Sequence, residues 1–326
     1  TEGYLKNYWN TDDINNLMDL ISKNYNSFEK VNSGYGFWKI IDKINHLKNA
    51  NSLSGSKKNI HAHYDLGNDF YSKWLDETMT YSSAFFIENE NKLENAQTSK
   101  YQLILDSLDL PIGSTILEIG CGWGGFLEHA SRKGYKVKGI TISQEQYKFA
   151  SERIQNLPNR PEIELIDYRN LEDKFDAIVS IEMFEAVGSA YWETYFNKIR
   201  EVLKPNGKAI IQTIIMKEDY YEGYHDWPDF IQTYIFPGGE LSSDKVFKKI
   251  ASQSNLDASG VTTMANSYAK TLEIWFNNFQ QKWSEINEIG FDDKFKRTWE
   301  MYLAYCRGGF LNGQLDVVQY KLTHKS

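Results

Sequence analysis

From residue 114 onward, the spacing of hydrophobic positions switches repeatedly between that of a buried strand and that of an amphipathic helix. Short apolar runs predict strands at residues 114–119, 136–142, 162–167, 175–181 and 208–215. Helical spacing predicts helices among them at residues 124–133, 144–156 and 191–203. This alternation is typical of an α/β fold, in which a mostly parallel sheet carries helices on both faces.

Other patterns place further elements around this sheet. Helical spacing predicts a helix over Asp12–Tyr25, and residues 256–266 and 315–322 predict two late strands. The residues of Lys204–Gly207 are typical of a turn, here before the fifth strand. Aromatic residues, two prolines and a Gly-Gly pair interrupt the alternation over 217–252, which we interpret as a cap insertion.

The polar stretch Asn49–Asn59 suggests a division of the chain. Residues 1–58 are interpreted as a helical N-terminal segment, with the remnant of a truncated lipid-binding domain as one reading. Residues 59–326 contain the whole alternating pattern and form the predicted catalytic domain.

Composition narrows the classes of partner. Aromatic residues make up 15% of the 326 residues, enough to build a core or to line an apolar pocket. The net charge of −8 gives no general attraction to nucleic acid, so none is expected as a partner. Basic clusters such as the one at 294–297 are typical of solvated faces, and contact with a membrane surface is the alternative.

The two cysteines, Cys121 and Cys306, indicate neither a disulfide framework nor a metal site. No apolar run has the length of a membrane span, and no secretory leader is visible. We therefore expect a cytoplasmic protein without a bound metal.

The most specific local signal is LEIGCGWGG at residues 117–125. Its strand carries an acid, Glu118, and leads into the spaced glycines Gly120, Gly122 and Gly124. Glycine lacks a Cβ, so the backbone can turn tightly into a helix and approach a nucleotide-like ligand. A glycine turn that serves packing alone is the structural alternative.

The end of the second predicted strand distinguishes between kinds of nucleotide site. The residues there are Thr141, Ser143, Gln144 and Gln146, and none is the acid that grips ribose in a dinucleotide site. The glycine loop also lacks the Lys-Ser/Thr pair of a P-loop. We therefore predict a site for S-adenosylmethionine (SAM).

Eight motifs follow one another along nearly the whole chain. They are HYDLGNDFY (63–71), MTYSSAFF (79–86), LEIGCGWGG (117–125), GITISQEQ (139–146), DYRNL (167–171), MFEAVG (183–188), YIFPGG (234–239) and AYCRGGF followed by DVVQ. Together they resemble the cyclopropane fatty acid synthase and mycolic acid cyclopropane synthase family. The resemblance implies a Rossmann-like class I SAM-dependent methyltransferase fold with a seven-stranded sheet. It also implies an apolar tunnel for an unsaturated acyl chain of a phospholipid at the membrane surface.

The resemblance further implies which residues contact SAM. They are Tyr81, Ser82, Glu118, Gly120, Cys121, Gly122, Trp123, Gly124, Thr141, Ile142, Ser143, Gln146, Tyr168 and Arg169. The backbone amides of Gly120 and Gly122 can face the cofactor carboxylate at the start of a helix, where the dipole favours an anion. Tyr168 can border the adenine ring.

The implied reaction requires an oriented sulfonium methyl, aromatic faces around a carbocation, and a base that removes a proton. In the best-understood members of the family, a bicarbonate ion is held by Cys, Glu, His, an Ile backbone and Tyr. The corresponding residues here are Ser83, Glu185, Gln212, Ile214 and Tyr268. The donors of Ser and Gln can still hold an anion, but the loss of His removes a positive charge and weakens its binding.

Glu182 stands where the family often has glycine, three residues before Glu185. Two carboxylates in a dry site raise one pKa and offer a base that belongs to the protein. A capping or salt-bridge role is the structural interpretation of Glu182. Cys306 occupies a cysteine position once proposed as catalytic in the family. Since methylation of an alkene needs no thiolate, we interpret Cys306 as a pocket residue and keep it as a candidate.

The functional prediction is a SAM-dependent enzyme that forms cyclopropane acyl chains and associates peripherally with the inner face of the membrane. Family members often form homodimers. Three alternatives stay open: a methylene or methyl-branched product, methyl transfer to a soluble small molecule, and a non-catalytic SAM-binding module. The departures at Ser83, Gln212 and Glu182 favour the first of these, and an intact Glu185 argues against the last.

Overall fold

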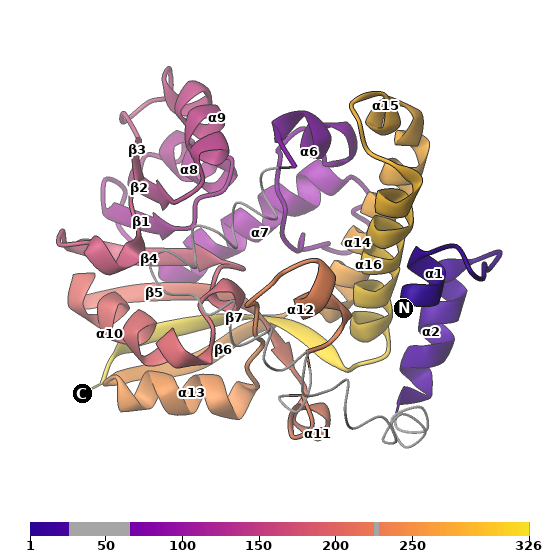
Figure 1. Ribbon diagram of the computed structural model, residues 1–326. Coiled ribbons are helices and arrows are strands. Elements are labelled where there is room, and N and C mark those ends of the chain that lie inside the picture. Colours follow the sequence, from indigo (N-terminus) through magenta and orange to yellow (C-terminus); the bar gives the residue numbers. More distant parts are fainter. Residues whose placement is uncertain (26–65, 225–227, 326) are drawn as a thin grey trace.

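The computed structural model describes residues 1–25, 66–224 and 228–325, and a seven-stranded sheet runs through it (Figure 1). The strands are β1 (Thr115–Ile119), β2 (Lys136–Thr141), β3 (Glu162–Leu165), β4 (Phe175–Ile181), β5 (Leu203–Met216), β6 (Leu256–Thr263) and β7 (Leu315–His324). Their order in the sheet is β3-β2-β1-β4-β5-β7-β6. Neighbours among β1 to β5 pair in parallel, whereas β7 runs antiparallel to both β5 and β6. The predicted mostly parallel sheet is confirmed, as are its two late strands.

The helices form a group on each face of the sheet and a third layer beside it. They are α1 (Glu2–Leu5), α2 (Ile14–Lys23), α6 (Asn68–Trp74), α7 (Leu93–Leu108), α8 (Gly125–Arg132), α9 (Gln144–Ile154), α10 (Trp192–Val202), α11 (Glu218–Tyr221), α12 (Phe230–Tyr234), α13 (Asp244–Gln253), α14 (Ala265–Gln281), α15 (Trp283–Glu288) and α16 (Asp293–Leu311). Short 3-10 turns follow β3 and β4, at η1 (Tyr168–Asn170), η2 (Phe184–Ala186) and η3 (Ser189–Tyr191).

Alternate residues of the central strands enter two hydrophobic cores, one on each face. Ile116 of β1 and Val179 of β4 pack with α7 and α8, while Leu117 and Ile178 pack on the other face with α10 and α13. Successive side chains of a strand point to opposite faces, so both sets of residues in each apolar run are buried. This arrangement explains why the strands have continuous apolar runs.

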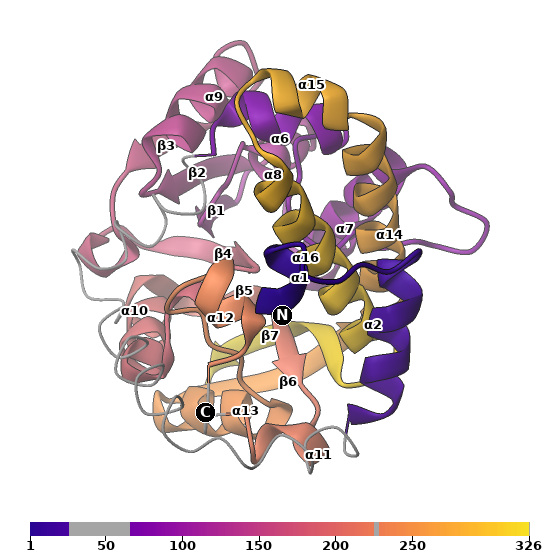
Figure 2. The ribbon, with the colours of Figure 1, turned by 45° about the vertical axis from the view of Figure 1, so that its right-hand side comes forward.

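The third layer consists of α14 and α16, with α6 and α2 packed against them (Figures 1 and 2). Its core is aromatic. The ring of Phe70 lies 5.1 Å from that of Trp299, and the ring of Trp74 lies 5.8 Å from that of Trp275, both edge-on. Such pairs add to the stabilisation from burial. Part of the high aromatic content therefore builds this layer.

The fifth strand starts earlier than predicted, and the residues of the predicted turn, Lys204–Gly207, fall inside its range. Strand β5 already begins at Leu203, and these four residues form a bulge within it. Phe175 of β4 pairs with Leu203 and Ala177 pairs with Lys208, so the extra residues have no partners in the register. Turn-forming residues suit a bulge because it has the same need for irregular backbone.

The predicted cap insertion, residues 217–252, has two parts. Residues around α11 and α12 line the cavity described below, whereas α13 packs against β6 and α10. The extent of the cap therefore stays a prediction. The predicted domain boundary between residues 58 and 59 also stays a prediction, since it lies outside the described residues.

Candidate active site

A cavity of about 890 Å³ lies at the carboxyl ends of β1, β2, β4 and β5. Ligands of open α/β sheets bind at this edge because the loops after parallel strands converge there. Most of the predicted site residues line it: Tyr81, Ser82, Glu118, Gly120, Cys121, Gly122, Trp123, Thr141, Ile142, Gln146, Tyr168, Arg169, Glu182, Glu185, Tyr268 and Cys306. The fold thus brings segments that are far apart in the sequence to one cavity.

The loop after β1 depends on glycines in the left-handed backbone region. Gly120 has φ +78° and Gly122 has φ +52°. A Cβ at Gly120 would lie 2.8 Å from Cγ of Met183, whereas a Cβ at Gly122 would meet no atom within 4 Å. Gly122 therefore borders open cavity space at the N-terminus of α8, a favourable place for an anionic group of a ligand.

Two polar side chains mark the walls beside this loop. Glu118 is buried, and its Oε2 has no hydrogen-bond partner within the described ranges 1–25, 66–224 and 228–325. Burial raises the pKa of this carboxyl well above the usual range. The Thr141 hydroxyl donates to Gln146 Oε1 at 2.9 Å. An unpartnered carboxyl group next to the glycine loop fits the amino group of SAM, which carries a positive charge.

Tyr168 and Arg169 close another side of the cavity. The Arg169 guanidinium lies 5.4 Å from the Tyr168 ring centroid and donates two hydrogen bonds to Asp167, at 2.8 and 2.7 Å. Burial raises the pKa of Tyr168 to about 12, so its hydroxyl stays protonated at neutral pH. A fixed aromatic face with polar neighbours fits an adenine ring. Together with Glu118 and Gly122, these residues fit SAM.

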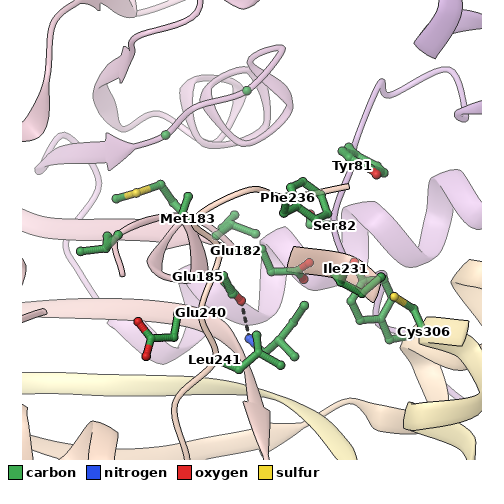
Figure 3. A pocket seen from close by; sticks show the side chains of 18 of the residues that line it. Tyr81, Ser82, Glu182, Met183, Glu185, Ile231, Phe236, Glu240, Leu241 and Cys306 are labelled. Atoms are coloured by element: carbon green, nitrogen blue, oxygen red, sulfur yellow. Dashed lines mark hydrogen bonds between the residues drawn. The ribbon is translucent and has the colours of Figure 1, made fainter. Parts of the chain in front are cut away.

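Glu182 and Glu185 enter the cavity from the segment that follows β4 (Figure 3). Glu182 Oε1 accepts hydrogen bonds from the Ser83 backbone N–H and from Gln212 Nε2, each at 2.8 Å. Glu185 Oε1 accepts from the Ile214 backbone N–H at 2.5 Å and from a threonine hydroxyl of β5 at 3.0 Å. Glu185 Oε2 is buried and has no hydrogen-bond partner among the residues that the structure describes.

The two carboxyl groups differ in charge at neutral pH. Burial, and then the charge of Glu182, raises the pKa of Glu185 to about 8. Burial also raises the pKa of Glu182. The Lys100 ammonium lowers this pKa most strongly, and the hydrogen bonds from Gln212 and Ser83 lower it further. A dry pocket holds one negative charge more readily than two. Glu182 therefore carries the charge, and Glu185 carries a proton.

Lys100 is a site residue that sequence reasoning missed. Its side chain is fully buried, and its Nζ donates to Ser82 Oγ at 2.6 Å and to Gln97 Oε1 at 2.7 Å. Burial lowers its pKa to about 8, and the nearby charge of Glu182 opposes this most strongly. A signal was available, because Lys100 shares the buried face of α7 with residues such as Ile104, and lysine is rarely buried unless paired.

Four predicted site residues lie behind the cavity wall rather than in it. Gly124 is the N-cap of α8, and a Cβ there would lie 3.2 Å from Cβ of Ala150 on α9. Ser143 is the N-cap of α9, and its hydroxyl accepts from the backbone N–H of Gln146. These two residues shape the loops that face the cavity. The other two, Ser83 and Gln212, lie behind Glu182.

Bicarbonate does not fit the residues present. Ser83 and Gln212 are fully buried, and the Ser83 backbone N–H and Gln212 Nε2 already donate hydrogen bonds to Glu182. The Ile214 N–H already serves Glu185. A free anion would compete with the protein's own carboxylates for these donors, and the negative charge nearby would repel it. The residues at these five positions therefore do not fit a bicarbonate ion.

The other side of the cavity is apolar and aromatic. The hydroxyls of Tyr81 and Tyr302 are hydrogen-bonded at 2.7 Å, and the Tyr268 ring lies 4.6 Å from that of Phe310. Cys306 lines this region, and burial raises the pKa of its thiol far above the usual range. The thiol is therefore protonated, and this wall suits an apolar chain.

A family model described as "Mycolic acid cyclopropane synthetase" matches residues 51–320. The chain belongs to this family. It is 38% identical over 281 residues to the tuberculostearic acid methyltransferase UfaA1 of Mycobacterium tuberculosis, a match that covers 83% of this chain and 66% of the relative. It is 40% identical over 249 residues to the cyclopropane-fatty-acyl-phospholipid synthase of Escherichia coli, covering 76% and 63%. The chain thus spans about two thirds of the length of these family members.

Solved structures of family members have the same fold. The mycolic acid cyclopropane synthase CmaA1, complexed with SAH and CTAB, matches with a TM-score of 0.76 and 30% identity, over 82% of this chain and 97% of that one. The cyclopropane synthase MmaA2 from Mycobacterium tuberculosis matches with a TM-score of 0.75 and the same identity and coverage. The predicted family and the class I SAM-dependent methyltransferase fold are confirmed. In the part of the chain that the structure describes, no helix combines the length and apolarity needed to span a bilayer.

Proposed function

We propose that the protein transfers a methyl(ene) group from SAM to the cis double bond of an unsaturated phospholipid acyl chain, giving a cyclopropane. One observation supports this most directly. A single cavity is lined by the glycine loop, by the aromatic wall and by the side chains of Glu182 and Glu185, which Figure 3 shows close together. The names of its relatives, a tuberculostearic acid methyltransferase and a cyclopropane-fatty-acyl-phospholipid synthase, agree with this chemistry.

In this proposal, the residues around the glycine loop hold and orient the cofactor. When bound, SAM supplies an electrophilic methyl group on a sulfonium centre. The open space at Gly122 admits the cofactor carboxylate, Glu118 receives its amino group, and Tyr168 borders its adenine. Orientation matters here because an unactivated alkene is a weak nucleophile, and correct alignment supplies much of the rate.

The aromatic wall has two tasks in the proposed reaction. Methyl transfer leaves a carbocation on the acyl chain, and the rings of Tyr81, Tyr268 and Phe236 line the cavity in which it forms. Aromatic faces attract a cation without bonding to it covalently. The apolar side chains also exclude water, which would trap the cation as an alcohol.

A second product from the same alkene is the alternative. Loss of a proton from a neighbouring chain carbon gives a methyl-branched alkene instead of a ring. A 1,2-hydride shift onto the cationic carbon, followed by loss of a proton from the new methyl group, gives a methylene chain. The observation that favours it is the engagement of the bicarbonate donors by Glu182 and Glu185, which changes the position of the base. The similarity to UfaA1, named a tuberculostearic acid methyltransferase, agrees with this alternative.

We propose that lipid enters beside α2 and the cap. Tyr25, which follows the C-cap of α2, and Tyr220 of α11 both line the cavity, and their rings lie 5.8 Å apart. Tyr25 is 38% exposed, so the cavity has an aromatic rim of the kind that suits a membrane interface. Peripheral association with the inner face of the membrane is part of this proposal. A cytoplasmic location and a homodimer stay predictions.

Mass spectrometry of lipids tests the proposal. The protein is incubated with SAM and vesicles of mixed unsaturated phospholipids, and the products are then hydrogenated under conditions that reduce alkenes. A gain of one methylene that leaves no reducible double bond supports the cyclopropane. The same gain with a reducible double bond supports the alternative. Methylation of a soluble acceptor with no change in any lipid contradicts both.

A further inference from the structure

Position 182 combines a glycine-like backbone with a charged side chain. Glu182 is the first residue after β4 and has φ +50°, in the left-handed region that disfavours residues with a Cβ. A strained conformation persists only when the surrounding contacts fix it, and such residues cluster at functional sites. The contacts of the Glu182 side chain therefore hold this residue in a conformation that local folding alone disfavours.

Donors from two distant segments meet at this one carboxylate. The Ser83 backbone N–H and Gln212 Nε2 both donate to Glu182 Oε1 at 2.8 Å. Gln212 is oriented in turn by Gln319 of β7, which donates to Gln212 Oε1 at 3.0 Å. The main chain adds a further link, because the Glu182 N–H donates to the Gln212 carbonyl at 2.8 Å. The carboxylate is thus fixed in place while it still lines the cavity.

Charges around Glu182 support its ionised form. Among nearby charges, Glu182 interacts most strongly with Lys100, which is buried behind Ser82. The neighbouring Glu185 has a pKa of about 8 and is protonated at neutral pH, so it adds no second charge. The Tyr268 hydroxyl also lowers the pKa of Glu182 by hydrogen bonding. The cavity therefore contains one fixed carboxylate, with a buried ammonium behind it.

We propose that Glu182 is the resident base of the reaction, and that its carboxylate occupies the site in which a free anion would otherwise bind. This inference rests on the proposed function. After methyl transfer, a C–H bond of the cation breaks and its proton goes to a Glu182 oxygen. The electron pair of that bond forms the new ring bond or a double bond. Glu182 is then a neutral acid, and it returns the proton to water when the product leaves.

A binding experiment tests the site without any turnover. ¹³C-bicarbonate is titrated into the wild-type protein and into Glu182→Gly, each saturated with SAH, and its binding is followed by the width of the ¹³C resonance. Glycine removes the carboxylate, leaves the donors of Ser83 and Gln212 free, and suits the backbone at φ +50°. We expect Glu182→Gly to bind bicarbonate at least tenfold more tightly than the wild type. Equal affinity in the two proteins overturns the inference.

Asn206→Gly is the matched control. Asn206 has φ +64° in the bulge of β5 and does not line the cavity, so glycine relieves a similar backbone there. This variant should resemble the wild type in bicarbonate binding. Calorimetry with SAH verifies that Glu182→Gly is folded. If that variant does not bind SAH, Glu182→Gln replaces it in the turnover assay, because the amide preserves the size of the side chain but cannot act as a base.

Turnover on unsaturated vesicles in CO₂-free buffer completes the test. The wild type should be fully active and gain nothing from added bicarbonate. The turnover rate of Glu182→Gly should be at least a hundredfold lower than that of the wild type, since general bases contribute about 10²–10⁴-fold to the rate. Added bicarbonate should raise the rate of this variant at least tenfold. Glu182→Gln should stay inactive. A wild type that requires bicarbonate, or an active Glu182→Gln, overturns the inference. A wild type that modifies no alkene contradicts the proposed function instead, and the binding experiment still decides the role of Glu182.

Discussion

Replacement of Glu185 by glutamine should make the protein more stable at neutral pH. Glu185 Oε1 accepts two hydrogen bonds, and Oε2 is buried without a partner. Glutamine preserves the accepting oxygen and the size of the side chain. It resembles the protonated acid, which is the form that the folded protein favours because burial and the charge of Glu182 raise the pKa to about 8.

The size of the effect depends on pH. The folded protein binds this proton up to about pH 8, whereas an unfolded chain releases it near the usual value of 4.5. Wild-type stability therefore falls as the pH rises from about 4.5 to about 8, and it is unaffected by this group below that range. At 1.36 kcal/mol for each unit of pKa, the loss is about 3 kcal/mol at pH 7 and approaches about 5 kcal/mol above pH 8. Glu185→Gln escapes this loss.

Urea unfolding of both proteins at pH 5, 7 and 8.5 measures the difference. The free energy of unfolding should differ by less than about 1 kcal/mol at pH 5, and the variant should be more stable by about 3 kcal/mol at pH 7. If the difference in the free energy of unfolding between the wild type and the variant did not change with pH, Glu185 would not hold a proton in the folded protein. Such a result would also refute the assignment of the negative charge to Glu182.

Three further predictions concern the cofactor loop, the buried lysine and the cysteine. Gly122→Ala and Gly113→Ala both place a Cβ at positive φ with no atom within 4 Å, so each should cost about 1–2 kcal/mol of stability. Calorimetry should show at least a tenfold loss of SAM affinity for Gly122→Ala but not for Gly113→Ala, because Gly113 does not line the cavity. Equal SAM affinities of the two variants would contradict this placement of the cofactor. Lys100→Met should shift the acidic limb of the pH–rate profile to higher pH, since it removes the charge that lowers the pKa of Glu182; an unmoved limb would disprove this coupling. Cys306→Ala should preserve turnover within tenfold because its thiol is protonated, and a larger loss with normal SAM binding would restore a catalytic role.

The sequence predicted the sheet well because its signals are local. Apolar runs and glycines with positive φ depend on neighbours in the chain, so the strands and the loop around Gly122 could be recognised. The link from Ser83 to Glu182 could not, because a backbone N–H is present at nearly every residue and leaves no trace in the sequence. The sequence showed that a cysteine had been replaced at position 83. It did not show that the main chain of that residue would hold a carboxylate.

The bulge at Lys204–Gly207 illustrates the opposite error. Its residues satisfy the local rules for a turn and have no partners in β4, but the pairing of Leu203 with Phe175 makes β5 begin before them. Lys100 is a third case. Its position on the apolar face of α7 was visible, yet the acids that justify its burial come from other segments of the chain. Contacts between segments that are distant in the sequence determine all three features: the hydrogen bond from Ser83 to Glu182, the bulge in β5 and the burial of Lys100.

The place of β7 in the sheet has a consequence for the order in which the protein is assembled. This strand lies between β5 and β6, although both precede it in the chain. During synthesis, β6 has no partner in the sheet and β5 exposes one open edge until residues 315–324 emerge. A nascent chain is therefore exposed to mispairing until a late stage, and chaperones should protect the edge of β5 during that interval. The same strand carries Gln319, which orients Gln212 toward Glu182, so the hydrogen-bond network around Glu182 cannot be completed before this insertion.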